Sequence, residues 1–106
     1  MLKSELINAL SFNKRCLSKS TLIPIFSHFC FTPTTISSFN GVQGIVVDFE
    51  TGLNCAVPGE IFNALIQNSN SEDLQISYSG NKVIIKDGKS VSKLETLPAD
   101  NFVFTL

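Results

Sequence analysis

The segment LNCAVPGEIFNALIQ, residues 53–67, changes from a strand pattern to a helix pattern at Pro58. Residues 53–57 form a short run with the composition of a buried strand. Pro58 and Gly59 then open a helix, because proline suits the first helical turn. The apolar stripe of this helix consists of Ile61, Phe62, Leu65 and Ile66, and its polar side of Glu60, Asn63 and Gln67. A strand that leads directly into an amphipathic helix indicates layers of sheet and helix.

A first helix is predicted near the N-terminus, over residues 2 to about 15. Apolar and polar residues alternate there with a helical period, so that one side is apolar and the other polar. The apolar side consists of Leu2, Leu6, Ala9 and Leu10, and the opposite side of Ser4, Asn8, Ser11 and Arg15. Such a helix packs one face against a sheet and leaves the other exposed.

Three strands are predicted between the two helices and before residue 53. Residues 25–32 are rich in aromatic and β-prone residues and stop at Pro33. Residues 35–39 and 44–50 follow, separated by an Asn-Gly turn at residues 40–41. With the strand at 53–57 they form a predicted meander of four.

Three more strands are predicted after the second helix, at residues 74–78, 83–86 and 90–96, with glycine-containing turns between them. The element order is therefore helix, four strands, helix, three strands. This order indicates an α+β fold with two helices packed on one face of a mostly antiparallel sheet. We expect residues 1–106 to form a single domain, since one hydrophobic core usually serves about 100 to 150 residues.

Composition limits the kinds of function. The formal net charge is −1, which gives no general attraction to phosphate, so any contact with nucleic acid must be local or geometric. The chain has no apolar run of the length that a membrane span requires, about 18 residues, and its N-terminus lacks the apolar core of a signal peptide. A protein without membrane contacts, located in the cytoplasm, is expected.

Catalytic or metal-binding chemistry has little support in the sequence. His28 and Cys30 share one face of a predicted strand, which leaves open a metal site or a nucleophile. A structural zinc site would also need Cys16 and Cys55 to converge on that pair, and a nucleophile would need an orienting group and an oxyanion hole. The carboxylates are scattered and the glycines lie one per turn. We therefore expect no enzyme activity, metal or cofactor.

Several segments, taken in order, resemble the N-terminal domain of the bacterial-type DNA polymerase sliding clamp, the polymerase III beta subunit. The residues that carry the resemblance are STLIPIF (20–26), AVPG (56–59), Leu65-Ile66, VIIKDGKS (83–90) and LETLPADNF (94–102). Their order along most of the chain makes the set more specific than any one of them.

The resemblance implies a non-catalytic replication processivity factor. In this family, similar domains form a ring of six, with helices lining a hole that holds duplex DNA without sequence specificity and sheets outside. The implied partners are a DNA polymerase and a clamp loader, and the implied assembly is a homo-oligomeric ring. Lys19 lies in the loop where the family can touch DNA, and Lys14 and Arg15 can join it. The same cations also suit a helix C-terminus, which leaves simple dipole compensation open.

Ring closure in the family involves an edge of the first domain. The resemblance thus makes the strand at residues 90–96, with Val91, Lys93 and Leu94, a candidate oligomer interface. An ordinary edge strand protected by its lysines is the alternative. A complete subunit of the family holds three such domains, and this chain has the length of one. A clamp-like protein interaction adaptor without DNA binding remains the alternative function.

Overall fold

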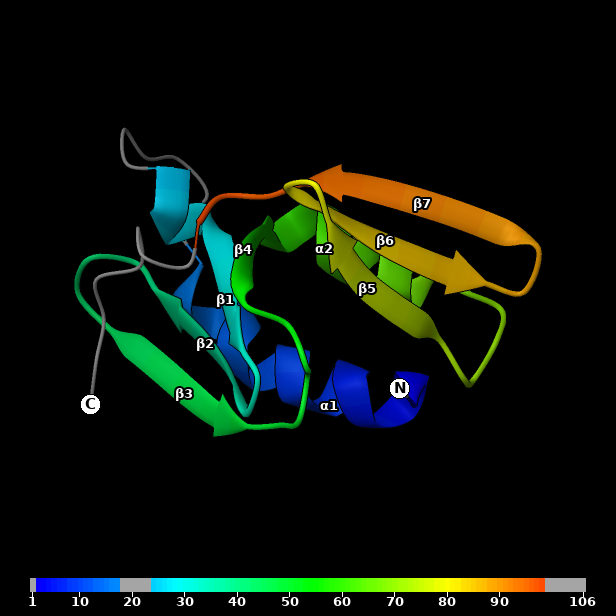
Figure 1. Ribbon diagram of the computed structural model, residues 1–106. Helices are drawn as coiled ribbons and strands as arrows, with labels where there is room; N and C mark the ends of the chain where they lie inside the picture. The colour runs from blue at the N-terminus through cyan, green and yellow to red at the C-terminus, as the bar shows by residue number, and fades with distance from the viewer. Residues whose placement is uncertain (1, 18–23, 99–106) are drawn as a thin grey trace.

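The computed structural model describes residues 2–17 and 24–98, which form two α-helices and seven strands. The elements are α1 (Lys3–Asn13), the 3-10 helices η1 (Lys14–Cys16) and η2 (Pro24–Ser27), β1 (His28–Thr32), β2 (Thr35–Phe39), β3 (Gly44–Asp48), β4 (Cys55–Pro58), α2 (Gly59–Gln67), β5 (Gln75–Ser79), β6 (Lys82–Asp87) and β7 (Ser90–Glu95). This order confirms the predicted α+β class (Figure 1).

The strands divide between two antiparallel sheets, of order β3-β2-β1-β4 and β5-β6-β7. The predicted meander of four is wrong in its last step, because β4 pairs with β1 and not with β3. The connection from β3 crosses the β1–β2 turn, where Phe49 N donates to Thr34 O at 3.0 Å and Thr51 N to Pro33 O at 3.0 Å. These contacts carry the chain across the end of the sheet to its other edge.

The first strand starts later than predicted. Residues 25–32 were expected to be extended, but Pro24–Ser27 is a 3-10 helix and β1 begins at His28. A proline suits the first position of a helical turn, because it lacks the N–H that such a position leaves unpaired. The apolar composition of this stretch therefore indicated burial correctly without fixing its backbone.

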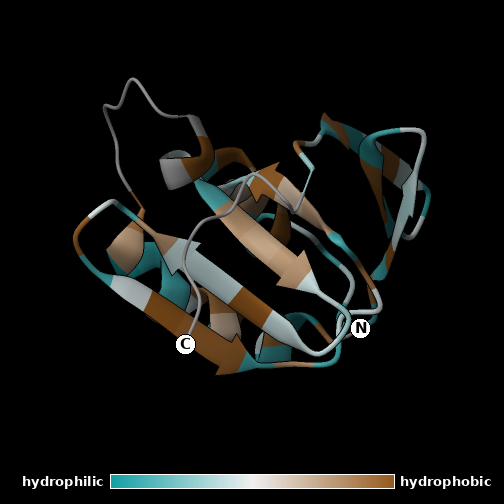
Figure 2. Cartoon of the chain, turned by 60° about the vertical axis from the view of Figure 1, so that its left-hand side comes forward, coloured by the Kyte–Doolittle hydropathy of each residue, from teal (hydrophilic) through white to brown (hydrophobic). Residues whose placement is uncertain are grey.

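One hydrophobic core is shared by both sheets and both helices. It contains Leu6 and Leu10 of α1, Phe62 of α2, and residues from strands of each sheet. The ring of Phe62 meets Phe31 edge-on, with centroids 5.3 Å apart. In Figure 2 the helices lie behind the four-stranded sheet, and hydrophobic residues extend to its edge strand β3.

Helix α2 is rotated relative to the predicted stripe. Ile61 was expected on the apolar side but is 55% exposed, and Asn63 was expected on the polar side but is 8% exposed. The approach of Gly59 to Leu17 turns the helix toward the end of α1, since a Cβ added at Gly59 would lie 2.5 Å from Leu17 Cδ1. Phe62 and Ile66 fill the core in this orientation.

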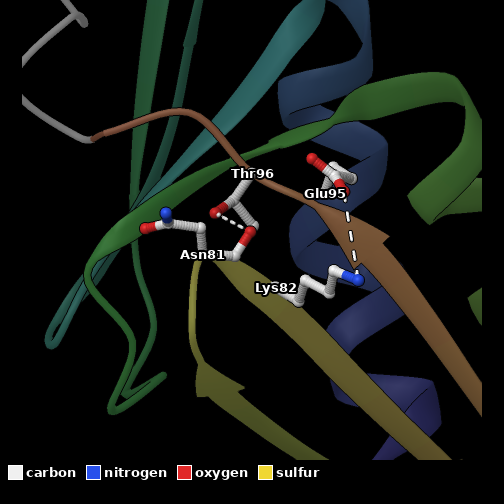
Figure 3. Close-up of polar contacts among 4 residues, drawn as sticks. All are labelled: Asn81, Lys82, Glu95 and Thr96. Atoms are coloured by element: carbon white, nitrogen blue, oxygen red, sulfur yellow. Dashed lines mark hydrogen bonds and ion pairs between the residues drawn. The ribbon is translucent and has the colours of Figure 1, made fainter.

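The two sheets are joined where β7 ends. Ala56 of β4 and Leu97 exchange two backbone hydrogen bonds of 2.9 Å each. Just before Leu97, the N–H and hydroxyl of Thr96 donate to the carbonyl of Asn81, at 3.0 and 2.9 Å. Figure 3 shows Asn81 and Thr96 beside the exposed Lys82–Glu95 ion pair, whose atoms are 4.0 Å apart. The end of β7 is thus fixed to both sheets.

Candidate nucleic-acid interface and subunit edge

The two helices lie side by side, and α1 continues into η1, which carries two of the predicted DNA-binding residues (Figure 1). Lys14 and Arg15 are both exposed, as predicted. The third predicted residue, Lys19, lies outside the described residues. The exposed positions on α1 and α2 are Ser4, Glu5, Asn8, Ser11, Phe12, Glu60, Ile61, Ala64 and Gln67. Among described residues, the positive charge exposed on this helical surface is therefore concentrated at the end of α1.

Acidic residues limit the strength of this positive surface. Lys14 and Glu60 line the same small cavity, of about 70 Å³, together with Leu17 and Asn63. Glu5 lies in the first turn of α1, far along the helix from Arg15. Exposed positive charge therefore lies at the C-terminal end of α1 and exposed negative charge at its N-terminal end. This arrangement suits a local contact with phosphate better than electrostatic attraction over the whole helical surface.

A buried polar contact fixes the end of α1 directly before the cations. Ser38 Oγ donates to the carbonyl of Asn13 at 2.6 Å and approaches its side-chain Oδ1 at 3.1 Å. Asn13 Nδ2 in turn donates to the carbonyl of Ala9 at 3.2 Å. Because Asn13 and Ser38 are both completely buried, these bonds hold the helix end on β2.

The contact between Asn13 and Ser38 was not predicted from the sequence. Asn13 falls three residues after Leu10 and four after Ala9, so helical spacing places it on the buried side of α1. A polar residue at an apolar position of a helix was the available signal.

A second polar contact fixes the other end of α1. The carboxylate of Glu72 accepts hydrogen bonds from the N–H of Ser4, at 3.1 Å, and from its hydroxyl. These bonds lower the pKa of Glu72. Asp87 accepts N–H bonds from Asn70 and Ser71, each 2.7 Å, and these lower its pKa as well. Both carboxylates thus tie the segment after α2 to its neighbours.

The predicted oligomer interface lies on β7, an edge strand of the three-stranded sheet. Val91 and Lys93 are exposed, whereas the half-buried Leu94 packs against the core from the other face. Leu97 directs both its N–H and its C=O toward β4. Because backbone groups alternate along a strand, those of Val91 and Lys93 point toward the same open edge. Val91 and Lys93 therefore share the open edge and one side-chain face, whereas Leu94 belongs to the opposite face.

The thiols and His28 do not converge. Register places His28 and Cys30 on one face of β1, as predicted, with partners Pro58 and Ala56 on β4. Cys55 comes one residue before Ala56 and pairs with Phe31, so its side chain points to the opposite face of the sheet. Within residues 2–17 and 24–98, no group of three or more His, Cys, Asp or Glu residues could hold a metal ion.

Burial makes the thiols poor nucleophiles. Cys16, Cys30 and Cys55 are all buried. Burial raises the pKa of each thiol. For Cys55, burial and the nearby Cys30 together raise the pKa to about 11. The thiol form therefore predominates at neutral pH, which gives no support to a Cys–His nucleophile. In the same part of the chain, no helix has the length and apolar character needed to cross a membrane.

Two adjacent helices backed by two antiparallel sheets are the fold of a sliding-clamp domain. The whole chain superimposes on the DNA polymerase beta subunit of Streptococcus pyogenes with a TM-score of 0.86 and 22% sequence identity, covering 32% of that chain. The DNA polymerase III beta subunit of Thermotoga maritima matches with a TM-score of 0.83 and 20% identity, with 31% of its chain covered. The Helicobacter pylori beta clamp bound to a DNA ligase peptide gives 0.83 and 20%, with 32% covered.

The resemblance predicted from the sequence is thus confirmed as a likeness in fold. The chain spans about a third of the length of the clamp subunits that it matches. Comparison with protein families gave no match, and neither did comparison with curated protein sequences.

Proposed function

We propose that this chain is one domain of a ring-shaped sliding clamp that encircles duplex DNA and tethers a replicative DNA polymerase. The observation that carries the proposal is the match of the whole chain to bacterial clamp subunits, with a TM-score of 0.86 for the first. A ring holds DNA by topology, so a domain with a net charge of −1 can serve where an ordinary DNA-binding protein would be strongly basic. The protein acts in the cytoplasm as a non-catalytic scaffold.

In this function the helices face the DNA, and Lys14 and Arg15 supply the phosphate contact, joined by Lys19, which follows them in the sequence. The exposure of the first two at the end of α1 supports this assignment. Their number is small and Glu60 lies beside Lys14. Each copy therefore contributes a weak contact that allows sliding.

The domain of residues 1–106 is one of three in a complete subunit, and its β7 edge meets another subunit. The open backbone edge at Val91 and Lys93 supports this assignment, because pairing of edge strands joins sheets across subunits. Leu94 contributes by holding β7 on the core. A homo-oligomeric ring, opened by a clamp loader, is the resulting assembly.

The test is retention of the natural full-length protein on DNA after loading onto a nicked circular plasmid with the clamp loader of its own source. The fraction of fluorescently labelled protein that stays with the plasmid is measured by gel filtration before and after the plasmid is cut once. A ring remains on the circle and slides off the linear DNA. Equal retention on both forms would contradict encirclement, and absence of retention on the circle would favour the adaptor.

Charge reversal then tests the assigned contacts. Lys14→Glu combined with Arg15→Glu or Lys19→Glu should shorten retention on the circle severalfold while the fold is unchanged by circular dichroism. Lys86→Glu combined with Lys89→Glu, at two exposed lysines on β6 and in the β6–β7 turn, makes the same change of charge away from the helices and is the matched control. Unchanged retention in the double variants would remove these residues from the interface without affecting the clamp proposal.

A further inference from the structure

The three-stranded sheet carries positive charge on its outer face (Figure 1). Side chains alternate along a strand, so the register of β5, β6 and β7 assigns each one to a face. The core face holds the buried Val83 and Ile85. The outer face is exposed apart from a half-buried Ile84, and its charged residues are Lys82, Lys86, Lys93 and Glu95. A further exposed lysine, Lys89, lies in the β6–β7 turn.

Only one of these four lysines has a carboxylate partner in the described part of the chain. Lys82 forms the ion pair of 4.0 Å with Glu95, its register partner on β7 (Figure 3). Lys86, Lys89 and Lys93 take part in no ion pair with any described residue. Three uncompensated lysines therefore lie at the end of the sheet away from the Lys82–Glu95 pair.

The neighbouring carboxylates do not neutralise these lysines. Asp87 follows Lys86 in the sequence, but its side chain belongs to the core face and accepts the two backbone N–H bonds described above. Glu5 and Glu50 line a groove together with Lys86, and neither forms an ion pair within residues 2–17 and 24–98. The outer face is therefore positive, although the chain has a formal net charge of −1.

An exposed apolar side chain lies among the three uncompensated lysines. Val91 is 54% exposed, and its register partner on β6 is Lys86. Lys89 and Lys93 come two residues before and two residues after Val91. Ile84, the register partner of Lys93, extends the apolar area. Lysines on both sides of an apolar centre match a segment in which carboxylates stand two residues to either side of an apolar residue.

The composition of the face favours a protein partner over a nucleic acid. Single-stranded nucleic acids bind to aromatic side chains on which their bases stack. The aromatic residue of these three strands, Tyr78, pairs with the buried Val83 and belongs to the core face. A phosphate backbone gains nothing by covering Val91, whereas an apolar side chain removes apolar area from water there.

Access to the outer face does not depend on the edges of the sheet. A strand that pairs with β5 or β7 lies in the plane of the sheet, so it widens the face and leaves the side chains of Val91 and Lys93 uncovered. The face is also directed away from the core that contains residues of α1 and α2. Subunit contact at β7 and DNA contact at the helices are therefore both compatible with a partner on this face.

From these observations we infer a docking site for an acidic protein segment on the outer face of β6 and β7. The segment lies along β7 with an apolar side chain on Val91 and Ile84. Its carboxylates lie beside Lys89 and Lys93, and Lys86 adds a third positive charge. The site does not require DNA encirclement, so its failure would leave the clamp proposal intact.

The test uses the fluorescein-labelled peptide Gly-Glu-Glu-Leu-Leu-Glu-Glu-Gly, titrated with the natural full-length protein and followed by fluorescence anisotropy. In an extended chain, either face of this peptide presents Glu, Leu and Glu at alternate positions. We expect saturable binding that weakens as the salt concentration rises. A peptide with Gln in place of Glu should bind about tenfold more weakly, because several exposed ion pairs are lost together. A peptide with Ser in place of Leu should bind severalfold more weakly.

Variants of the protein separate this site from the DNA contact. Lys86→Gln combined with Lys93→Gln should weaken binding of the Leu peptide about tenfold. Lys14→Gln combined with Arg15→Gln removes the same charge from the end of α1 and should leave this affinity unchanged. Val91→Thr keeps the β-branched shape and should weaken binding of the Leu peptide but not of the Ser peptide. Circular dichroism verifies that each variant is folded.

Several results would overturn the inference. They are no saturable binding at millimolar protein, equal affinities for the Glu and Gln peptides, and an affinity that the change of Lys86 and Lys93 leaves unaltered. Binding of a thymidine octanucleotide at least as tight as that of the Leu peptide would assign the face to nucleic acid instead. Self-association in analytical ultracentrifugation that Lys86→Gln with Lys93→Gln abolishes would show that a second copy covers the face.

Discussion

Replacement of Gly59 by alanine tests the packing that positions α2 beside the end of α1. The added Cβ would lie 2.5 and 2.9 Å from the two δ-carbons of Leu17 and 2.9 Å from the carbonyl oxygen of Ser27. Leu17 can move, but the carbonyl belongs to the backbone directly before β1. Overpacking of this kind costs about 1 to 3 kcal/mol, and the better helix propensity of alanine offsets up to about 1 kcal/mol. We expect a net loss of about 2 kcal/mol.

The assay is urea unfolding followed by circular dichroism, together with the thermal midpoint, which should fall by about 10 °C. Combining Gly59→Ala with Leu17→Ala should cost less than the sum of the two single changes, because the smaller side chain removes the shortest contact. Ala64→Gly, at an exposed position of the same helix, should cost only the difference in propensity, about 1 kcal/mol. A Gly59→Ala variant as stable as the original would refute the close packing of Leu17 on α2.

Three further changes probe the anchors and the thiols. Ser38→Ala should lower the free energy of unfolding by about 2 kcal/mol in urea titration, because buried oxygens of Asn13 lose their donor, and an unchanged value would contradict this contact. The lowered pKa of Asp87 stabilises the fold at neutral pH, and this contribution is lost as the pH falls from about 4 through the lowered value. Asp87→Asn should therefore flatten the dependence of the unfolding midpoint on pH in this range, and an unchanged dependence would contradict the role of this carboxylate. At pH 8 a thiol reagent should label none of the three cysteines until denaturant is added, and rapid labelling of Cys55 in the folded protein would contradict its burial and its pKa of about 11.

Local patterns predicted the elements and their order well. Both helices, the hairpins of β5 to β7 and the strands β2 and β3 follow from periodicity and turn residues that act over a few positions. The pairing of β4 with β1 could not be predicted in the same way. It depends on backbone hydrogen bonds between the β3–β4 connection and Pro33 and Thr34. Backbone contacts of this kind can form with almost any side chains, so the sequence of neither segment indicates them.

The orientation of α2 on the core could not be predicted from the sequence either. Its sequence allows an apolar stripe through Ile61 or one centred on Phe62 and Ile66, since adjacent residues on a helix differ by only about 100°. The contact of Gly59 with Leu17 decides between them, and that contact is tertiary. For the site, the exposure of Arg15 followed from the polar side of the predicted first helix, whereas the burial of Asn13, which holds the end of α1 in place, did not.

The bridge between Ala56 and Leu97 makes the two sheets one cooperative unit at their junction. The residues lie far apart in the chain, so their two hydrogen bonds can form only when both sheets are assembled and correctly placed. Slow hydrogen exchange at these two amides should therefore reflect joint opening of the sheets and not fraying of either one. In the proposed ring, a load applied to β7 by a neighbouring subunit would pass through this junction directly into β4, which leads into α2.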